Sequence, residues 1–268
     1  MKEKIKIGYI GLGRRGTGVL KANLVDMSDI EIAYVCDLSE KRMEAARDIV
    51  IEKMGTTPIM TADYHDILRD PTVDAVFIMT NWYGRPEIAM EAMRAGKYTA
   101  FEVGCAENIN ICYDLVKTYE ETKTPIMMLE NCCYGRREMM ILNIVKQGLF
   151  GEIIHAEGAY IHNLDPFWKE YHSNWRLRYN ATHRGDVYPT HGIGPVCQAL
   201  DIHRGDKMDY LVSMDTKSVH GKAIAQEQLS AEERAELGIG ADDFANGDHV
   251  ATLIRTAKGK QIEIQHNV

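Results

Sequence analysis

The first half of the chain alternates short apolar runs with stretches whose apolar positions recur at helical spacing. The apolar runs cover residues 5–10, 30–37, 73–80, 98–103 and 125–130. Runs that are apolar throughout are typical of parallel strands buried on both faces. The segment between Ser39 and Gly55, and the segment containing Pro86 that stops at Gly96, have residues typical of helix ends. This alternation predicts a doubly wound parallel α/β domain over residues 1–130.

The pattern changes after about residue 130. One more helix is predicted over residues 136–148, and longer strands over 152–163, 208–219, 249–256 and 260–268. The tetrapeptide at 257–260, AKGK, indicates a hairpin, and Ser230 with Glu233 indicates a capping box. We therefore predict a C-terminal α+β domain with a mostly antiparallel open sheet over residues 131–268. Because its last strand reaches the end of the chain, we expect this domain to be incomplete.

A glycine-rich turn follows the first predicted strand. Gly11, Gly13 and Gly16 fit the pattern G-x-G-x-x-G, in which glycines allow a tight turn and a close approach of backbone to a pyrophosphate. The helix that begins there directs its N–H groups toward such an anion. Asp37 ends the second strand, where a carboxylate accepts hydrogen bonds from an adenosine ribose. These features predict NAD as the cofactor, and Arg14 and Arg15 keep NADP open.

Composition narrows the class of partner. The 268 residues carry a net charge of −8 and contain no run rich in lysine or arginine, so we expect no nucleic-acid partner. No apolar run approaches the roughly 18 residues of a membrane span, and no secretory signal precedes the first strand. Six scattered cysteines are typical of reduced thiols. We therefore expect a cytoplasmic protein with no membrane partner.

Candidate chemistry gathers in the second half, above all in the stretch VYPTHGIGP at 187–195. Tyr188 and His191 lie three residues apart at a predicted helix start, and Tyr160 and His162 share one strand face. A histidine so placed can act as a base, but the same pair can also form a structural hydrogen-bond network at the helix start. The sequence leaves both interpretations open. The histidines lack the spacing of a metal site, so we expect no metal.

Several longer strings resemble a known family. The strings IGYIGLGRRG and AMRAGKYTAFEV resemble the Gfo/Idh/MocA family, whose members join a Rossmann domain to an open-sheet domain and oxidise sugars or polyols with NAD(P). The strings MMLENCCYGRREMMILNIVKQGLFGEIIHAEGAYIHNL and YPTHGIGPVCQALDIHRGDKMDYLVSM resemble its glycoside hydrolase family 109 branch, NAD-dependent α-N-acetylgalactosaminidases. Glu102-Val103-Gly104 departs from the Glu-Lys-Pro motif of many sugar dehydrogenases. Trp82-Tyr83-Gly84-Arg85 keeps only the first tryptophan of the branch's Trp-Glu-Trp-His.

The resemblance assigns site residues by position. It implies that the cofactor is bound by Gly11, Gly13, Arg15, Gly16, Asp37, Trp82, Arg85, Glu102, Val103 and Asn131. It implies that the sugar is bound by Tyr160, Arg176, Tyr188 and His191. The catalytic proton-transfer groups would be His191, Tyr188, Tyr160 and His162.

The resemblance also implies a reaction: glycoside cleavage by transient oxidation at C3 of a sugar, elimination and re-reduction. This route does not need the paired carboxylates of ordinary glycosidases. Two alternatives stay open, a net NAD-dependent sugar or polyol dehydrogenase and a degenerate NAD-binding protein without activity. The exposed sheet faces of the family lead us to expect a homo-oligomer, a dimer or a tetramer.

Overall fold

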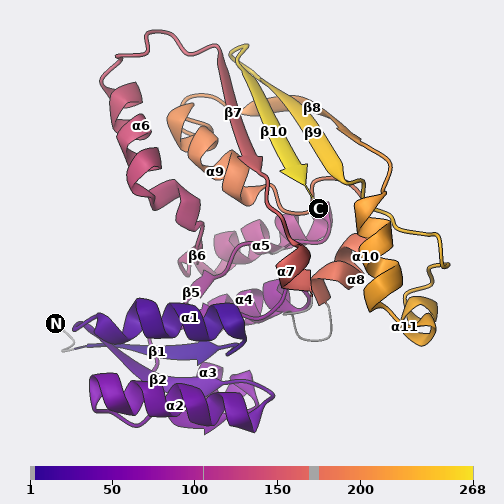
Figure 1. Ribbon diagram of the computed structural model, residues 1–268. Helices are drawn as coiled ribbons and strands as arrows, with labels where there is room; N and C mark the ends of the chain where they lie inside the picture. The colour runs from indigo at the N-terminus through magenta and orange to yellow at the C-terminus, as the bar shows by residue number, and fades with distance from the viewer. Residues whose placement is uncertain (1–3, 105, 169–174, 268) are drawn as a thin grey trace. The chain divides into compact units, whose positions relative to one another are not determined.

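Parallel strands build the sheet of the first of two units into which the chain divides, residues 1–129 and 130–268 (Figure 1). The computed structural model describes residues 4–104, 106–168 and 175–267. The strand order is β3-β2-β1-β4-β5-β6, and every pair is parallel. The strands are β1 (Ile5–Ile10), β2 (Ile30–Cys36), β3 (Ile59–Thr61), β4 (Ala75–Ile78), β5 (Tyr98–Phe101) and β6 (Ile126–Met128). The predicted doubly wound parallel sheet is confirmed.

Helices connect these strands: α1 (Arg14–Ala22), α2 (Glu40–Met54), α3 (Tyr64–Arg69), α4 (Arg85–Arg94) and α5 (Ile109–Thr122), with a short 3-10 helix η1 (Leu24–Asp26). Both faces of the sheet are buried beneath them. Ile7 and Tyr9 of β1 belong to one apolar cluster, whereas Ile10 belongs to another. Alternate residues of a strand point to opposite faces, so a strand covered on both sides is apolar throughout.

The predicted ends of α2 are confirmed, although its N-cap residue makes no capping bond. Gly55 ends α2 in the left-handed conformation at φ 71°, as expected of a C-terminal glycine. Ser39 occupies the N-cap position of α2 but its hydroxyl makes no capping bond.

Helix α5 forms where its apolar spacing predicted it, yet Tyr119 and Val116 on that stripe are exposed. Only Leu115 packs against the core there.

The second unit contains a mixed sheet with the strand order β7-β10-β9-β8 (Figure 1). β10 pairs with β7 in parallel, and the other two pairings are antiparallel, which confirms the mostly antiparallel sheet. Its strands are β7 (His155–Tyr160), β8 (Met208–Asp215), β9 (His249–Thr256) and β10 (Gln261–Asn267). Its helices are η2 (Asn131–Tyr134), α6 (Arg136–Lys146), α7 (Asp165–Trp168), α8 (Trp175–Thr182), α9 (Thr190–Ala199), α10 (His220–Gln228) and α11 (Ala231–Glu236).

Two predicted strands end earlier than the sequence suggested. β7 stops at Tyr160 and β8 at Asp215. β10 was predicted to reach Val268, which lies outside the described residues. The capping box of Ser230 and Glu233 is confirmed, with both reciprocal bonds present.

Helix α9 covers one face of this sheet (Figure 1). Val196 and Leu200 pack against Ile262 and Ile264 of β10. The start of α9 also lies against β7 with no room for side chains between the two backbones. A Cβ placed on Gly158 would lie 2.2 Å from the carbonyl oxygen of Gly192. Two glycines therefore fix the first turn of α9 beside the end of β7.

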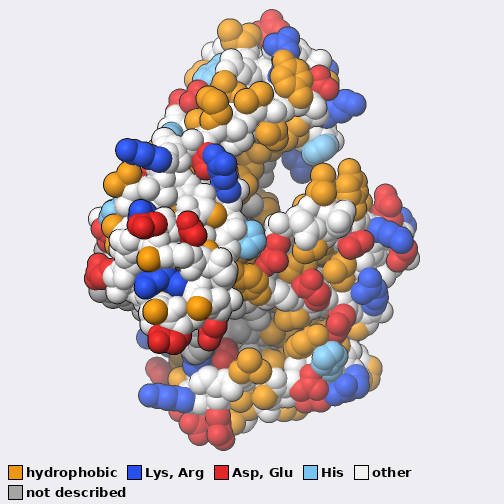
Figure 2. Space-filling view, turned by 90° about the vertical axis from the view of Figure 1, so that its right-hand side faces the viewer, with side chains coloured by type: hydrophobic (Ala, Val, Ile, Leu, Met, Phe, Trp, Pro, Cys, Tyr) orange, Lys and Arg blue, Asp and Glu red, His pale blue; other side chains and the backbone are white. Residues whose placement is uncertain are grey.

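The other face of the sheet is open. Tyr210, Val212 and Met214 of β8 are 58–72% exposed, and Leu253 of β9 is their neighbour on the same face. Hydrophobic side chains also gather on exposed parts of the molecule in Figure 2. Among the described residues, none of the helices combines the length and the apolar character needed to cross a membrane.

Candidate functional site

The glycine turn after β1 has the shape of a phosphate-binding cradle. Gly11 has φ 95°, and a Cβ there would lie 2.7 Å from the backbone of Met79. A Cβ on Gly16 would lie 2.1 Å from the carbonyl oxygen of Gly11, so only glycine allows α1 to approach the turn. A Cβ on Gly13 would meet open space, and among the described residues no side chain caps α1. The helix start is therefore open to an anion.

Asp37 ends β2 beside this turn. Its Oδ2 accepts the Leu12 N–H at 2.7 Å, and its Oδ1 accepts the Ser39 N–H at 2.9 Å. An ionised carboxylate has about four acceptor sites, so these two bonds leave capacity for ribose hydroxyls. The residue that was predicted to recognise the ribose thus also fixes the shape of the glycine turn.

The loop after β4 is held by a buried arginine. Arg85 is 3% exposed, and its Nη1 donates to the carbonyl oxygens of Glu102, Val103 and Gly104 at 2.6–2.7 Å. Its Nη2 donates to the carbonyl of Thr80. This guanidinium therefore ties the end of β4 to the end of β5. These contacts position the two loops, and the contact of Arg85 with the cofactor stays a prediction.

Three further predicted cofactor residues lie close to Arg85. Trp82 and Val103 are buried, and a Cβ on Gly104 would lie 2.4 Å from the indole nitrogen of Trp82. Glu102 is buried at the end of β5, and its Oε2 accepts a hydrogen bond from Nε of Arg15 at 2.8 Å. This ion pair joins the first turn of α1 to β5. The structure therefore groups the glycine turn, Arg15 and the β4 and β5 ends at one edge of the sheet.

In the second unit, Glu130 and His191 form a hydrogen-bonded pair 61 residues apart in sequence. Oε1 of Glu130 lies 2.7 Å from Nδ1 of His191. Glu130 directly precedes η2, and its Oε1 also accepts the Cys132 N–H at 2.9 Å. Helix α9 lies close enough that a Cβ on Gly194 would be 3.0 Å from Cγ of Glu130. The pair is thus built from two rigid helix starts.

The charge state of Glu130 fixes the tautomer of His191. Burial raises the pKa of Glu130, but the hydrogen bonds from His191 and the Cys132 amide outweigh it, and the net pKa is lowered. The carboxyl group is therefore ionised and accepts, so Nδ1 of His191 carries the proton. Nε2 is then the unprotonated nitrogen of the neutral ring. A carboxylate that orients an imidazole in this way is the arrangement used in general-base catalysis.

The start of α9 presents His191. The sequence predicted a helix start near Tyr188 and His191, and the N-cap position of α9 is occupied by Pro189, with no side chain among the described residues capping the helix. The ring of His191, in the first turn, is bonded to Glu130. The structure thus contains a hydrogen-bonded arrangement at this helix start, and the role of His191 as a base stays a prediction that the same contact would serve.

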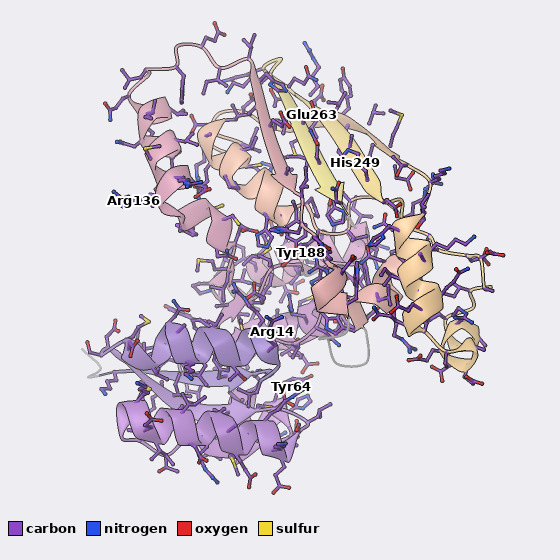
Figure 3. All side chains as sticks on the ribbon, in the orientation of Figure 1. Arg14, Tyr64, Arg136, Tyr188, His249 and Glu263 are labelled. Atoms are coloured by element: carbon purple, nitrogen blue, oxygen red, sulfur yellow. The ribbon has the colours of Figure 1, made fainter. Side chains whose placement is uncertain are left out.

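Aromatic rings surround His191. Its ring stacks on Tyr160 at 5.4 Å between centroids and meets the edge of Tyr188 at 4.8 Å. Tyr160 and Tyr188 meet edge to face at 4.9 Å. The exposed His162 lies just beyond β7 and contacts Tyr160 at 4.4 Å. Figure 3 shows Tyr188 near the start of α9. All four residues predicted to transfer protons are therefore in one cluster.

Arg176 supplies the positive charge of this cluster. It is 4% exposed on α8, and its Nη2 donates to the hydroxyl oxygen of Tyr160 at 3.1 Å. Its guanidinium carbon also lies 4.7 Å from the centre of the Tyr188 ring, a cation–π contact. A guanidinium that donates to a phenol oxygen stabilises negative charge on that oxygen. Arg176 therefore fixes the position of the Tyr160 hydroxyl within the cluster.

Two titratable groups of the second unit, one buried and one half-buried, were missed by sequence reasoning. His266 of β10 is 1% exposed and stacks on Tyr160 at 5.7 Å. Burial, with help from the charge of Arg176, lowers the pKa of His266 to about 4. Burial raises the pKa of Asp186 to about 6, although it accepts the Tyr188 N–H at 3.1 Å. His266 occurs in a strand pattern that gives no sign of a polar contact, so no sequence signal was available for it.

Cys132 completes the surroundings of His191. Its Sγ lies 3.3 Å from Nδ1 of His191, and ligand atoms of Glu130, Cys132 and His191 all lie within 4.8 Å of one another. These three groups could hold a metal ion. Spacing along the chain could not reveal this set, because two ligands precede the third by about 60 residues. Asn131, predicted near the cofactor, is exposed at the start of η2, where its side-chain amide lies 3.8 Å from Sγ of Cys132.

The chain matches two family models. Residues 5–129 match the model described as oxidoreductase family, NAD-binding Rossmann fold. Residues 134–268 match the model of the C-terminal domain of glycosyl hydrolase 109. Glycosyl hydrolase family 109 protein 5 of Phocaeicola vulgatus is 44% identical over 276 residues, which cover 99% of this chain and 51% of that protein. Glycosyl hydrolase family 109 protein 1 of Bacteroides fragilis is 44% identical over 98% of this chain and 56% of its own length.

The chain thus spans about half the length of the curated relatives it matches. Among solved structures, myo-inositol 2-dehydrogenase from Lactobacillus plantarum is similar with a TM-score of 0.74 at 16% identity, covering 99% of this chain and 70% of that one. The myo-inositol dehydrogenase from Lactobacillus casei, in complex with NAD(H) and myo-inositol, has a TM-score of 0.70 at 18% identity, with 99% and 68% covered. At these identities the likeness shows the fold.

Proposed function

The chain belongs to the glycosyl hydrolase 109 branch of the Gfo/Idh/MocA oxidoreductases, and on that premise we propose that it acts on a sugar with NAD. The specific reaction that we propose is cleavage of a glycoside through transient oxidation at C3. The observation that carries the proposal is the contact of 2.7 Å between Glu130 and His191 within a cluster of tyrosines.

The first unit has the features that NAD requires. The pyrophosphate would lie at the open start of α1, where Gly13 leaves space and α1 directs its N–H groups. Asp37 would accept the ribose hydroxyls, and its negative charge disfavours the additional phosphate of NADP. The remainder of the cofactor would be bordered by the residues of the first unit near the ends of β4 and β5 and the start of α1, Arg15, Trp82, Glu102 and Val103. Arg85 would hold the loops. Bound NAD supplies one function, the reversible uptake of a hydride from a sugar carbon.

The aromatic cluster of the second unit is suited to a sugar. Tyr160 and Tyr188 offer ring faces and hydroxyl groups, and Arg176 offers donors. Aromatic rings with a few placed polar groups are the usual lining of a small-molecule site. The name of one solved neighbour includes both NAD(H) and myo-inositol, a polyol, which supports this class of ligand.

His191 would take the first proton. When a hydroxyl at C3 becomes a ketone, the carbon loses a hydride and the oxygen loses a proton. Nε2 of His191 would accept that proton, and Glu130 would stabilise the resulting imidazolium through the bond at Nδ1. A single placed base of this kind contributes about 100- to 10,000-fold to the rate.

Tyr160 or His162 would take the second proton. A C3 ketone acidifies the hydrogen at C2, so a base can remove that proton and form an enolate. The enolate then expels the group at C1, which leaves with the proton that the base took from C2. Water adds at C1 and supplies a proton to C2 through the same base. The hydride returns to C3, and His191 returns its proton to the C3 oxygen. Arg176 would hold the Tyr160 hydroxyl in place through its hydrogen bond to that oxygen.

A net sugar or polyol dehydrogenase is the second candidate. It is favoured by the solved neighbours, which carry inositol dehydrogenase names. The Glu130–His191 pair would serve hydroxyl oxidation equally well in that reaction. The two reactions differ in whether the C2 proton is exchanged with solvent and whether the hydride returns to the sugar.

A single assay separates these candidates. The chain is supplied with nitrophenyl α-glycosides and a catalytic amount of NAD in deuterated water. Release of nitrophenol with deuterium at C2 of the sugar and no accumulation of NADH supports the proposed reaction. NADH formed in proportion to substrate would replace it with the dehydrogenase. No turnover, with NAD still raising the melting temperature, would replace both with a binding protein.

A further inference from the structure

The ligand set around Nδ1 of His191 combines three kinds of donor atom. Glu130 offers a carboxylate oxygen, Cys132 a sulfur and His191 a ring nitrogen, all within 4.8 Å of one another. Oxygen, nitrogen and sulfur ligands together suit zinc and related soft cations, whereas magnesium and calcium prefer oxygen alone. Three protein ligands with a fourth position open to solvent is also a common coordination of zinc.

The present distances are close to those of a tetrahedral site. Two ligands of one zinc ion are separated by roughly 3.3–3.6 Å, given bond lengths of about 2.0–2.3 Å. Sγ of Cys132 already lies 3.3 Å from Nδ1 of His191. Oε1 of Glu130 lies 2.7 Å from the same nitrogen, so it must move outward by about half an ångström. Side-chain rotation provides a movement of that size.

The site is rigid and partly accessible. The side chains of His191 and Glu130 are 13% and 6% exposed, and Cys132 is half-buried. Gly194 keeps α9 against the segment that carries Glu130 and Cys133, since a Cβ there would lie 2.8 Å from Sγ of Cys133. Ligands that are fixed in advance lose little freedom on binding an ion.

We propose that Glu130, Cys132 and His191 form a binding site for a zinc-like divalent cation, and that its occupancy switches off the base described above. The switching part rests on the proposed function, whereas the binding part does not. Binding neutralises the ion, because one carboxylate and one thiolate together carry two negative charges. The thiol proton is released to solvent as the sulfur binds.

The inhibition follows from the tautomer of His191. Without metal, Nδ1 carries the proton and donates it to Glu130, so Nε2 accepts. A metal ion on Nδ1 displaces that proton, and in the neutral ring the proton must then be on Nε2. Nε2 becomes a donor and no longer takes a proton from a sugar hydroxyl. Glu130 is also removed from its role as the partner of the imidazole.

Cobalt is the probe for binding, because a cobalt–thiolate bond gives a charge-transfer absorption band. The full chain is freed of metal with a chelator and titrated with Co²⁺, and Zn²⁺ is then added as a competitor. We expect one equivalent to give the band and zinc to abolish it. Cys132→Ser and Cys132→Ala should lose the band and weaken binding by more than about 100-fold, since even changes outside the ligand shell cost 10- to 100-fold.

The matched control is Cys112→Ser, which removes an exposed thiol on α5 and should leave the band unchanged. Melting curves of both Cys132 variants establish that they are folded. A wild-type chain that gives no thiolate band at one equivalent would overturn the proposal, as would a folded Cys132→Ser that binds cobalt as tightly as the wild type.

The inhibition is measured separately with zinc and a chelator. Wild-type turnover should fall with the same midpoint as cobalt displacement and return on chelation. Full turnover at saturating zinc would overturn the switching role. A metal-free chain that has no turnover but gives the cobalt band would contradict the proposed function and support the metal site, so the two failures are distinguishable.

Discussion

Replacement of Glu130 by glutamine is the sharpest perturbation that the structure offers. Glutamine has the size of glutamate but no charge, and it can donate as well as accept. The bond from Nδ1 of His191 would lose its ionic partner, and the imidazole would no longer be held in one tautomer. The cofactor cradle, in the other unit, contains none of these atoms.

The size of the effect follows from the type of bond. A hydrogen bond to a charged group contributes about 1.5–3 kcal/mol. Each factor of ten in rate corresponds to about 1.4 kcal/mol of activation free energy. If the bond acts mainly on the imidazolium formed during turnover, kcat should fall about 10- to 150-fold.

The assay compares kcat on a nitrophenyl glycoside with the dissociation constant of NAD, for Glu130→Gln and for Glu157→Gln. Glu157 is an exposed residue of β7 and serves as the matched control. We expect Glu130→Gln to lose kcat and to keep its NAD affinity, while the control keeps both. If folded Glu130→Gln retained kcat within about twofold, the pair would be structural and the reasoning about the tautomer would be wrong.

Three other predictions concern the cofactor and the two titratable groups with shifted pKa values. Asp37→Arg should shift binding from NAD toward NADP; equal weakening of both, measured by titration, would remove Asp37 from ribose recognition. The pKa of Asp186 is raised from 3.8 to about 6, so the folded state holds its proton longer and stability falls as pH rises through this window. Asp186→Asn should therefore weaken the dependence of the melting temperature on pH between pH 4 and pH 6. If that dependence stays unchanged, the raised pKa does not belong to Asp186. The pKa of His266 is lowered from 6.5 to about 4, so its contribution to stability rises with pH between these values and is most unfavourable at about pH 4 and below. His266→Phe should therefore raise the melting temperature most near pH 4. A uniform loss at all pH values would mean that the ring nitrogens of His266 have partners.

The sequence predicted the elements of the first unit because its signals are local. Apolar runs covered on both faces, and glycines such as Gly11 that allow positive φ, act within a few residues. The same holds for the capping box of Ser230 and Glu233. Helix α5 shows the limit of such signals, since its apolar spacing predicted the helix but not that Val116 is exposed.

The contacts within the site could not be predicted, because they join distant segments. Tyr188 and His191 were identified as a pair, but nothing in the spacing connects His191 with Glu130 or with Cys132. His266 is likewise brought to Tyr160 only by the parallel pairing of β10 with β7. The one signal for Glu130 was its position directly after an apolar strand, where ligands of parallel sheets commonly bind.

The most direct test of the account is rapid mixing of the NAD-loaded chain with a glycoside, followed by the near-ultraviolet absorbance of reduced nicotinamide. The account predicts that this absorbance rises and then decays within one turnover. His191→Ala, with unchanged NAD affinity, should give no rise. The conditions must be ones in which the chemical steps limit the rate. If the wild type then releases nitrophenol with no transient absorbance, the proposed oxidation of the sugar by NAD is contradicted.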